Sequence, residues 1–174
     1  IDDRAELAHS QLLLARVAHH TGDNDEAVRL AESSLAINRA DKDQIAVTWA
    51  LHSLVHYAID QGNLGQARAA LGEGLGLAID SGYRWGTIAL LEAAAALAAA
   101  EEQPIRALRL AGAATALREP IGAPLPPDWR GDLDRQLAPA RQRLGEVGAA
   151  AAWNSGRSLT IDRAVLEAGA VRAG

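Results

Sequence analysis

The stretch LARVAHHTGDNDEAVRLAESSLAI, from Leu14 to Ile37, decides the fold because related stretches follow it twice along the chain. These are LVHYAIDQGNLGQARAALGEGLGL, from Leu54 to Leu77, and AAALAAAEEQPIRALRLAGAATAL, from Ala94 to Leu117. The three stretches begin at positions 14, 54 and 94, and we call this constant interval the repeat period. A fixed period of this length is typical of repeat proteins, in which each unit buries its apolar face against the next. The sequence therefore predicts an array of about three repeats, with a single up-and-down bundle as the alternative.

Each copy predicts two helices joined by a tight turn. In the first copy, Gly22 can adopt the left-handed conformation that ends a helix, and Asp23 or Asn24 can cap the next one. In the third copy Pro104 stands where the first turn of a helix tolerates proline. Small residues recur early in the second helices, where they let paired helices approach closely: Ala27, Ala67 and Ala107. The helical spacing of the first helix predicts an inward face of Leu7, Leu14 and Ala18, flanked by Leu13 and Val17.

The last third of the chain does not repeat. Four of the six prolines of the chain lie between Arg118 and Trp129, so the helix must end at Pro120. Beyond this stretch we expect a helix over 128–144 kinked at Pro139, a shorter one ending near Trp153, a break at 154–156, and a last helix over 161–168 capped by Thr160. The predicted organisation is three hairpins over 1–119 (about 1–40, 41–80 and 81–119), a proline-rich connection over 120–127, and capping helices over 128–174.

The composition of the chain favours an all-α protein and excludes several functions. Hydrophobic residues, mostly Ala and Leu, make up 49% of the sequence, and aromatic residues only 3%. Such a composition suits closely packed helices better than sheets. The net charge of −5 gives no basic field for nucleic acid or an anionic membrane. Without Cys there is no thiolate zinc site, iron–sulfur cluster or Cys nucleophile.

The sequence carries no recognisable catalytic or cofactor motif. It has no G-x-x-x-x-G-K-[ST] phosphate loop and no H-E-x-x-H. His52 and His56 are spaced so that two imidazoles share one helical face, but zinc needs three or four ligands. We therefore predict no enzyme, no cofactor and no metal site.

The repeats resemble the tetratricopeptide family. The glycine that precedes the turn in that family matches Gly22 and Gly62, and its small residue early in the second helix matches Ala27, Ala67 and Ala107. The early aromatic residue of the family is absent, and the repeat period is longer than the one usual for the family. The resemblance implies a right-handed superhelix of stacked antiparallel helical hairpins with a C-terminal helical cap.

The C-terminal third resembles the end of the helical-repeat region in bacterial LuxR-family and AfsR-like signal-transduction ATPases. The matching motifs are RALRLAGAATALREPIGAPLPP, RQRLG and AAAWNSGRSLTIDRAVLEAG. The resemblance implies a non-enzymatic, cytoplasmic sensor or protein-interaction domain of an ATP-dependent transcriptional regulator. Neither the ATPase core nor a helix-turn-helix is present, and the chain begins Ile-Asp-Asp, so we expect it to be part of a longer protein. The alternative is a free-standing adaptor or peptide-receptor domain without an ATPase.

The resemblance also implies where a ligand binds, because the first helix of each hairpin lines the concave groove in that family. The implied partner is a protein, a peptide or a small-molecule effector, together with the rest of the same regulator chain, and neither nucleic acid nor a membrane. All five His fall among the groove positions that match. The candidate site residues are His9, Arg16, His19, His20, Trp49, His52, His56, Asp60 and Glu92, and the apolar or small groove positions are Leu12, Ile59, Ala89, Ala96, Ala99 and Ala100.

Overall fold

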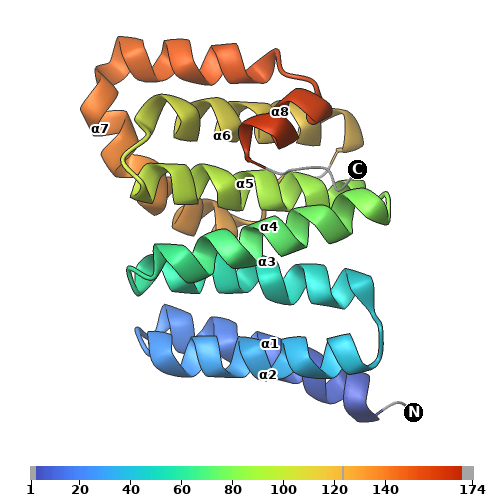
Figure 1. Cartoon of the computed structure of the whole chain (residues 1–174). Coiled ribbons are helices and arrows are strands. Elements are labelled where there is room, and N and C mark those ends of the chain that lie inside the picture. Colours follow the sequence, from blue (N-terminus) through green and yellow to red (C-terminus); the bar gives the residue numbers. More distant parts are fainter. Residues whose placement is uncertain (1–2, 123, 170–174) are drawn as a thin grey trace. The chain divides into compact units, whose positions relative to one another are not determined.

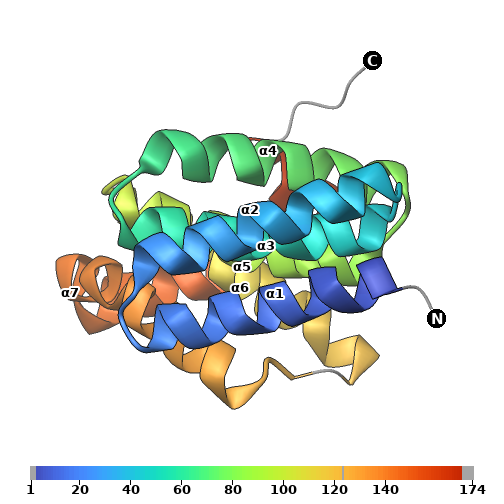
Figure 2. The ribbon, with the colours of Figure 1, turned by 90° about the horizontal axis from the view of Figure 1, so that it is seen from below.

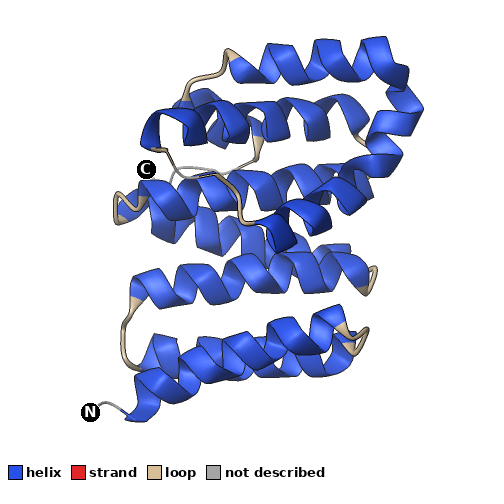
Figure 3. Cartoon of the chain, turned by 180° about the vertical axis from the view of Figure 1, so that it is seen from behind, coloured by secondary structure: helices blue, strands red, loops and turns tan. Residues whose placement is uncertain are grey.

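The computed structural model of the chain describes residues 3–122 and 124–169, and these are helical with no strand among them (Figure 3). The predicted all-α class is therefore confirmed. No helix of the described part has the length and apolar character needed to cross a bilayer. The chain divides into two compact units, 1–86 and 87–174, and the division falls inside a helix.

The first unit contains four complete helices: α1 (Asp3–His20), α2 (Asn24–Ala40), α3 (Gln44–Asp60) and α4 (Leu64–Asp80). Consecutive helices pack against each other, as Figures 1 and 2 show for α1 and α2. The inner faces carry small residues at helical spacing, among them Ala27, Ala31 and Ala67, which are fully buried. Polar contacts also join α2 to α4, including Arg39 with Glu73 at 2.6 Å. The two hairpins of this unit are therefore joined both through α2 and α3 and through α2 and α4.

The turns between helices recur at a constant interval, half the repeat period seen in the sequence. Each helix from α1 to α5 (Arg84–Ala100) is followed by one residue in the left-handed region: Gly22, Lys42, Gly62, Gly82 and Glu102. The N–H of the next residue then donates back to a carbonyl within the last turn, as Asp23 does to Ala18 at 2.9 Å. This bond closes the end of the helix. Asp23, Asp43 and Asn63 cap the next helices with their side chains. The cap at Asp23 and the position of Pro104 at the start of α6 (Pro104–Arg118) are as predicted.

The predicted inward face of the first helix is wrong. The buried residues of α1 are Ala8, Ala15 and His19, which recur at helical spacing, and the apolar ones among them are both alanines. The larger apolar residues lie outside, with Leu7, Leu13, Leu14 and Val17 exposed by 44–57%. The physical reason is that α1 approaches α2 through its alanines, as close packing requires, which turns the larger side chains away.

The second unit begins within α5 (Arg84–Ala100) and continues with α6 (Pro104–Arg118), a short 3₁₀ turn η1 (Glu119–Ile121), α7 (Pro127–Arg157) and α8 (Ile161–Glu167). In this unit α6 packs against both α7 and α8. As predicted, regular helix gives way before Pro120, and Thr160 caps the last helix by accepting a hydrogen bond from the N–H of Arg163.

One expectation for the last third is confirmed and another is wrong. The helix expected over 128–144 ends where predicted, because α7 leaves helical geometry at Gly145 and a second helical segment follows this bend (Figures 1 and 3). Gly145 has φ 65° and ψ 173°, a conformation that glycine adopts without strain. The break expected at 154–156 does not occur, because the helix continues to Arg157.

Gly156 serves close helix packing. A Cβ atom on Gly156 would overlap the backbone carbonyl of Arg109 in α6, and one on Gly112 would overlap the carbonyl of Trp153 in α7. The two glycines thus interlock α6 and α7 from both sides. Gly112 lies in the segment AGAAT and Gly156 in the segment WNSGR, which are parts of two of the C-terminal motifs quoted above. Those motifs therefore have a structural role in this chain.

This packing predicts opposite effects for two Gly→Ala changes. Gly156→Ala should lower the free energy of unfolding by about 1–3 kcal/mol, because the methyl group must push two helix backbones apart. Gly72→Ala, in α4 with no atom near the new Cβ, should raise it by about 0.4–1 kcal/mol. Urea denaturation followed by circular dichroism measures both. Equal effects of the two changes would contradict the close crossing.

Candidate functional site

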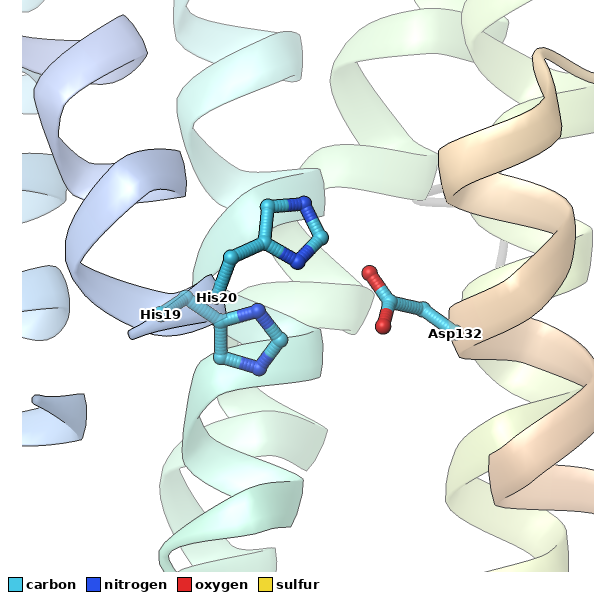
Figure 4. A group of neighbouring side chains, drawn as sticks. All are labelled: His19, His20 and Asp132. Carbon is cyan, nitrogen blue, oxygen red and sulfur yellow. The ribbon is translucent and has the colours of Figure 1, made fainter. Parts of the chain in front are cut away.

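The structure brings two of the predicted site residues together at the end of α1. The imidazole Nε2 of His19 lies 2.7 Å from a carboxylate oxygen of Asp60 in α3, and both side chains are largely buried. The His19 ring also lies 4.7 Å from that of Tyr57 and 5.7 Å from that of His20. Figure 4 shows the two adjacent histidines; the third side chain drawn there, Asp132, belongs to the second unit. The contact of His19 with Asp60 ties α1 to α3 and orients the His19 ring.

Further along α3, three predicted residues form a continuous run of rings. Trp49 and His52 are in edge contact with ring centroids 5.6 Å apart, and His52 and His56 follow at 4.9 Å. The indole N–H of Trp49 donates to the hydroxyl of Tyr83 at 3.0 Å. His52 is buried, whereas Trp49 and His56 are half-buried. The run therefore presents one indole edge and one imidazole toward the surface of α3, with the buried His52 ring between them.

The remaining predicted residues are dispersed. On α1, His9 and His20 are exposed and Arg16 is half-buried. Glu92 belongs to α5 in the second unit, where it is 5% exposed and enclosed by other side chains. The candidate site residues implied by the family resemblance therefore do not form one site. Most of them lie on α1 and α3 in the first unit, and Glu92 is a buried carboxylate in the second.

Glu92 forms a buried ion pair with Arg118 of α6. Two parallel hydrogen bonds join them, from Nε to Oε1 at 2.5 Å and from Nη2 to Oε2 at 2.7 Å. Their side chains are only 6% and 5% exposed. Burial raises the pKa of the Glu92 carboxyl, and the hydrogen bonds and charge of Arg118 act in the opposite direction. Such a pair fixes the relation of α5 to α6 within the second unit more than it stabilises the fold.

Arg118 was not among the candidate site residues predicted from the sequence, although its position indicated that it is buried. It continues the buried face of α6 at helical spacing, after Ala107, Ala111 and Ala114. A charged residue at a core-facing helical position needs a buried partner. Glu92, within the most apolar run of the chain, is the matching charge. The two positions together indicate an internal ion pair.

The exposed apolar residues of α1 form a further candidate site, which we call the α1 stripe: Leu7, Leu13, Leu14 and Val17. Shifting three of its positions by the repeat period leads to residues of α3. Leu7 corresponds to Val47, Leu14 to Leu54 and Val17 to Tyr57. These three are 3–4% exposed, on a helix that packs against α2. The α1 stripe therefore has the register of a helix-packing face, but it is open to solvent.

Comparison with models of protein families, with curated proteins and with solved structures found no match for this chain. The resemblance to tetratricopeptide repeats and to LuxR-family regulators accordingly rests on the motifs themselves. The geometry of the described residues is the independent basis for a function.

Proposed function

We propose that the chain is a non-enzymatic helical-repeat module that binds a protein partner, as the C-terminal part of a bacterial ATP-dependent transcriptional regulator acting in the cytoplasm. In this proposal its hairpins stack in a right-handed superhelix of the tetratricopeptide kind. The recurrence of helices and left-handed turns at a constant interval supports the repeat character. The proposal includes no catalysis, cofactor or metal, and no direct contact with nucleic acid or membrane.

The α1 stripe is the observation that carries the proposal. Four large apolar side chains on one helix, each at least 44% exposed, make a patch of the kind that marks protein interaction sites. The equivalent residues of α3 are buried, on a helix that packs against α2 and α4. We therefore take a helix with the character of α2, which precedes α3 in the chain, as the partner of the stripe. That helix would come from the rest of the regulator chain or from a second protein.

The rings of α1 and α3 support a second binding face in the same module, the groove that the family resemblance implies. Trp49, His56 and the His19–Asp60 pair all lie on the first helices of their hairpins, α1 and α3. An indole edge and imidazole donors suit a polar or acidic ligand.

The alternative of a free-standing adaptor or peptide receptor uses the same two faces. The length of the full gene distinguishes it, because a regulator has a nucleotide-binding motif upstream.

A helix supplied as a separate peptide tests the proposal. A hydrocarbon-stapled peptide of residues 24–40, the α2 sequence, should bind the chain, and Leu14→Glu should weaken binding about tenfold or more by placing a charge in the contact. Val147→Glu is the matched control, since Val147 is 85% exposed on α7. Fluorescence anisotropy of the labelled peptide gives both dissociation constants. Binding that is unchanged by Leu14→Glu would contradict the proposal.

A further inference from the structure

The second unit contains a cavity of about 510 Å³ that the proposed function does not use. Helices α5, α6 and α7 and the connection after α6 contribute its lining. A volume of this size lies within the usual range of small-molecule sites, about 300–1,000 Å³. The cavity is lined by the internal ion pair of Glu92 with Arg118 and by apolar residues of α7.

Most of the wall is apolar. Leu133 and Leu137 lie one turn apart on the same face of α7, and Trp153 comes from the same helix beyond its bend. Leu137 is fully buried and Leu133 and Trp153 are half-buried, so the wall is continuous with the core on one side. This wall offers an acyl chain or a ring a surface shielded from water.

The charged groups at the cavity leave one cation without a carboxylate partner in the described part of the chain. Arg118 is joined to Glu92, Arg141 to Asp134 at 2.8 Å, and Glu119 to Arg157 at 2.8 Å. Arg130 lines the same cavity, and its contact is a long hydrogen bond of 3.4 Å to the carbonyl oxygen of Leu125. An anionic group bound beside Arg130 would therefore gain a charge-assisted hydrogen bond without breaking an existing ion pair.

We propose that this cavity is a binding site for a small amphipathic molecule with one anionic group, such as a medium-chain carboxylate. The apolar body lies against Leu133, Leu137 and Trp153, and the anionic group pairs with Arg130. This inference goes beyond the proposed function, because it concerns a different unit and needs no partner on the α1 stripe.

The four tryptophans provide the readout. Incorporating 5-fluorotryptophan gives one ¹⁹F resonance each for Trp49, Trp85, Trp129 and Trp153, assigned by Trp→Phe changes. Titrated octanoate should shift the Trp153 resonance saturably and leave those of Trp49 and Trp85 unchanged. Octanol and octylamine, of equal chain length, should bind at least about tenfold more weakly, since they lack the anionic group.

Two variants on α7 separate the charge from the cavity. Arg130→Gln should weaken octanoate binding about tenfold, whereas Arg135→Gln, which removes an exposed arginine outside the cavity, should leave it unchanged. Leu133→Trp should fill the cavity and abolish the Trp153 shift, while the α2 peptide still binds to α1.

Several outcomes would overturn the inference. Equal affinity for octanol would refute the anionic group, and an effect of Arg135→Gln equal to that of Arg130→Gln would refute the role of Arg130. A parallel shift of all four tryptophans, or no shift of Trp153, would refute the cavity as the site. None of these results bears on peptide binding at the α1 stripe, so the two proposals fail separately.

Discussion

Arg118→Met is expected to be among the most destabilising single changes in this chain, lowering the free energy of unfolding by about 3–5 kcal/mol. It removes the buried cation that forms two hydrogen bonds with Glu92, and an unpaired carboxylate then remains in the core. The pair itself adds little net stability, because both ions are desolvated. The double variant Glu92→Met/Arg118→Met should therefore recover most of the loss. A double variant as unstable as the single one would show that the pair acts through packing and not through charge.

The loss in Arg118→Met should also depend on pH. Burial already raises the pKa of Glu92, and the variant lacks the opposing effect of Arg118. A carboxyl whose pKa is higher in the folded than in the unfolded chain binds more protons when folded, so the free energy of unfolding decreases as the pH rises through that range. The difference between wild type and Arg118→Met should thus be larger at pH 8 than at pH 5, as urea denaturation at both values would measure. An equal difference at both values would contradict the buried carboxylate.

Leu54→Ala and Leu14→Ala should lower the free energy of unfolding by very different amounts, although the two leucines occupy equivalent positions in the repeat. Leu54 is 3% exposed on α3, and its truncation should cost about 2–5 kcal/mol through lost burial and a cavity. Leu14 is 55% exposed on α1, and its truncation should change stability by less than about 0.5 kcal/mol.

Thermal or urea melts of the two variants test whether the α1 stripe is exposed to solvent although the equivalent residues of α3 are buried. If Leu14→Ala cost as much as Leu54→Ala, the stripe would already be covered, for example in a dimer. Sedimentation of the wild-type chain would then identify that state. If both changes were harmless, the packing of α3 in the first unit would be refuted.

Local chemistry determined much of this fold from the sequence alone. Gly22 and Gly62 ended helices, Asp23 capped the next one, Pro104 opened α6 and Thr160 capped α8, as predicted. These effects act over a few residues, so they can be read without knowing the neighbours in space. The inner faces of the second helices, with Ala27, Ala67 and Ala107, also followed from spacing.

Only the tertiary structure decided which face of α1 is buried and what Gly156 does. Periodicity assigned the larger apolar residues of α1 to the core, but contact with α2 selects Ala8 and Ala15. The larger residues stay outside because no described helix of the first unit covers them. The sequence predicted a helix break at Gly156. In the structure Gly156 lies within α7, where the absence of a Cβ atom lets the backbone of α6 approach closely. Spacing places Arg118 on the buried face of α6, and the apolar run around Glu92 indicates burial there as well, but the tertiary structure decides that these two helices meet so that the charges pair.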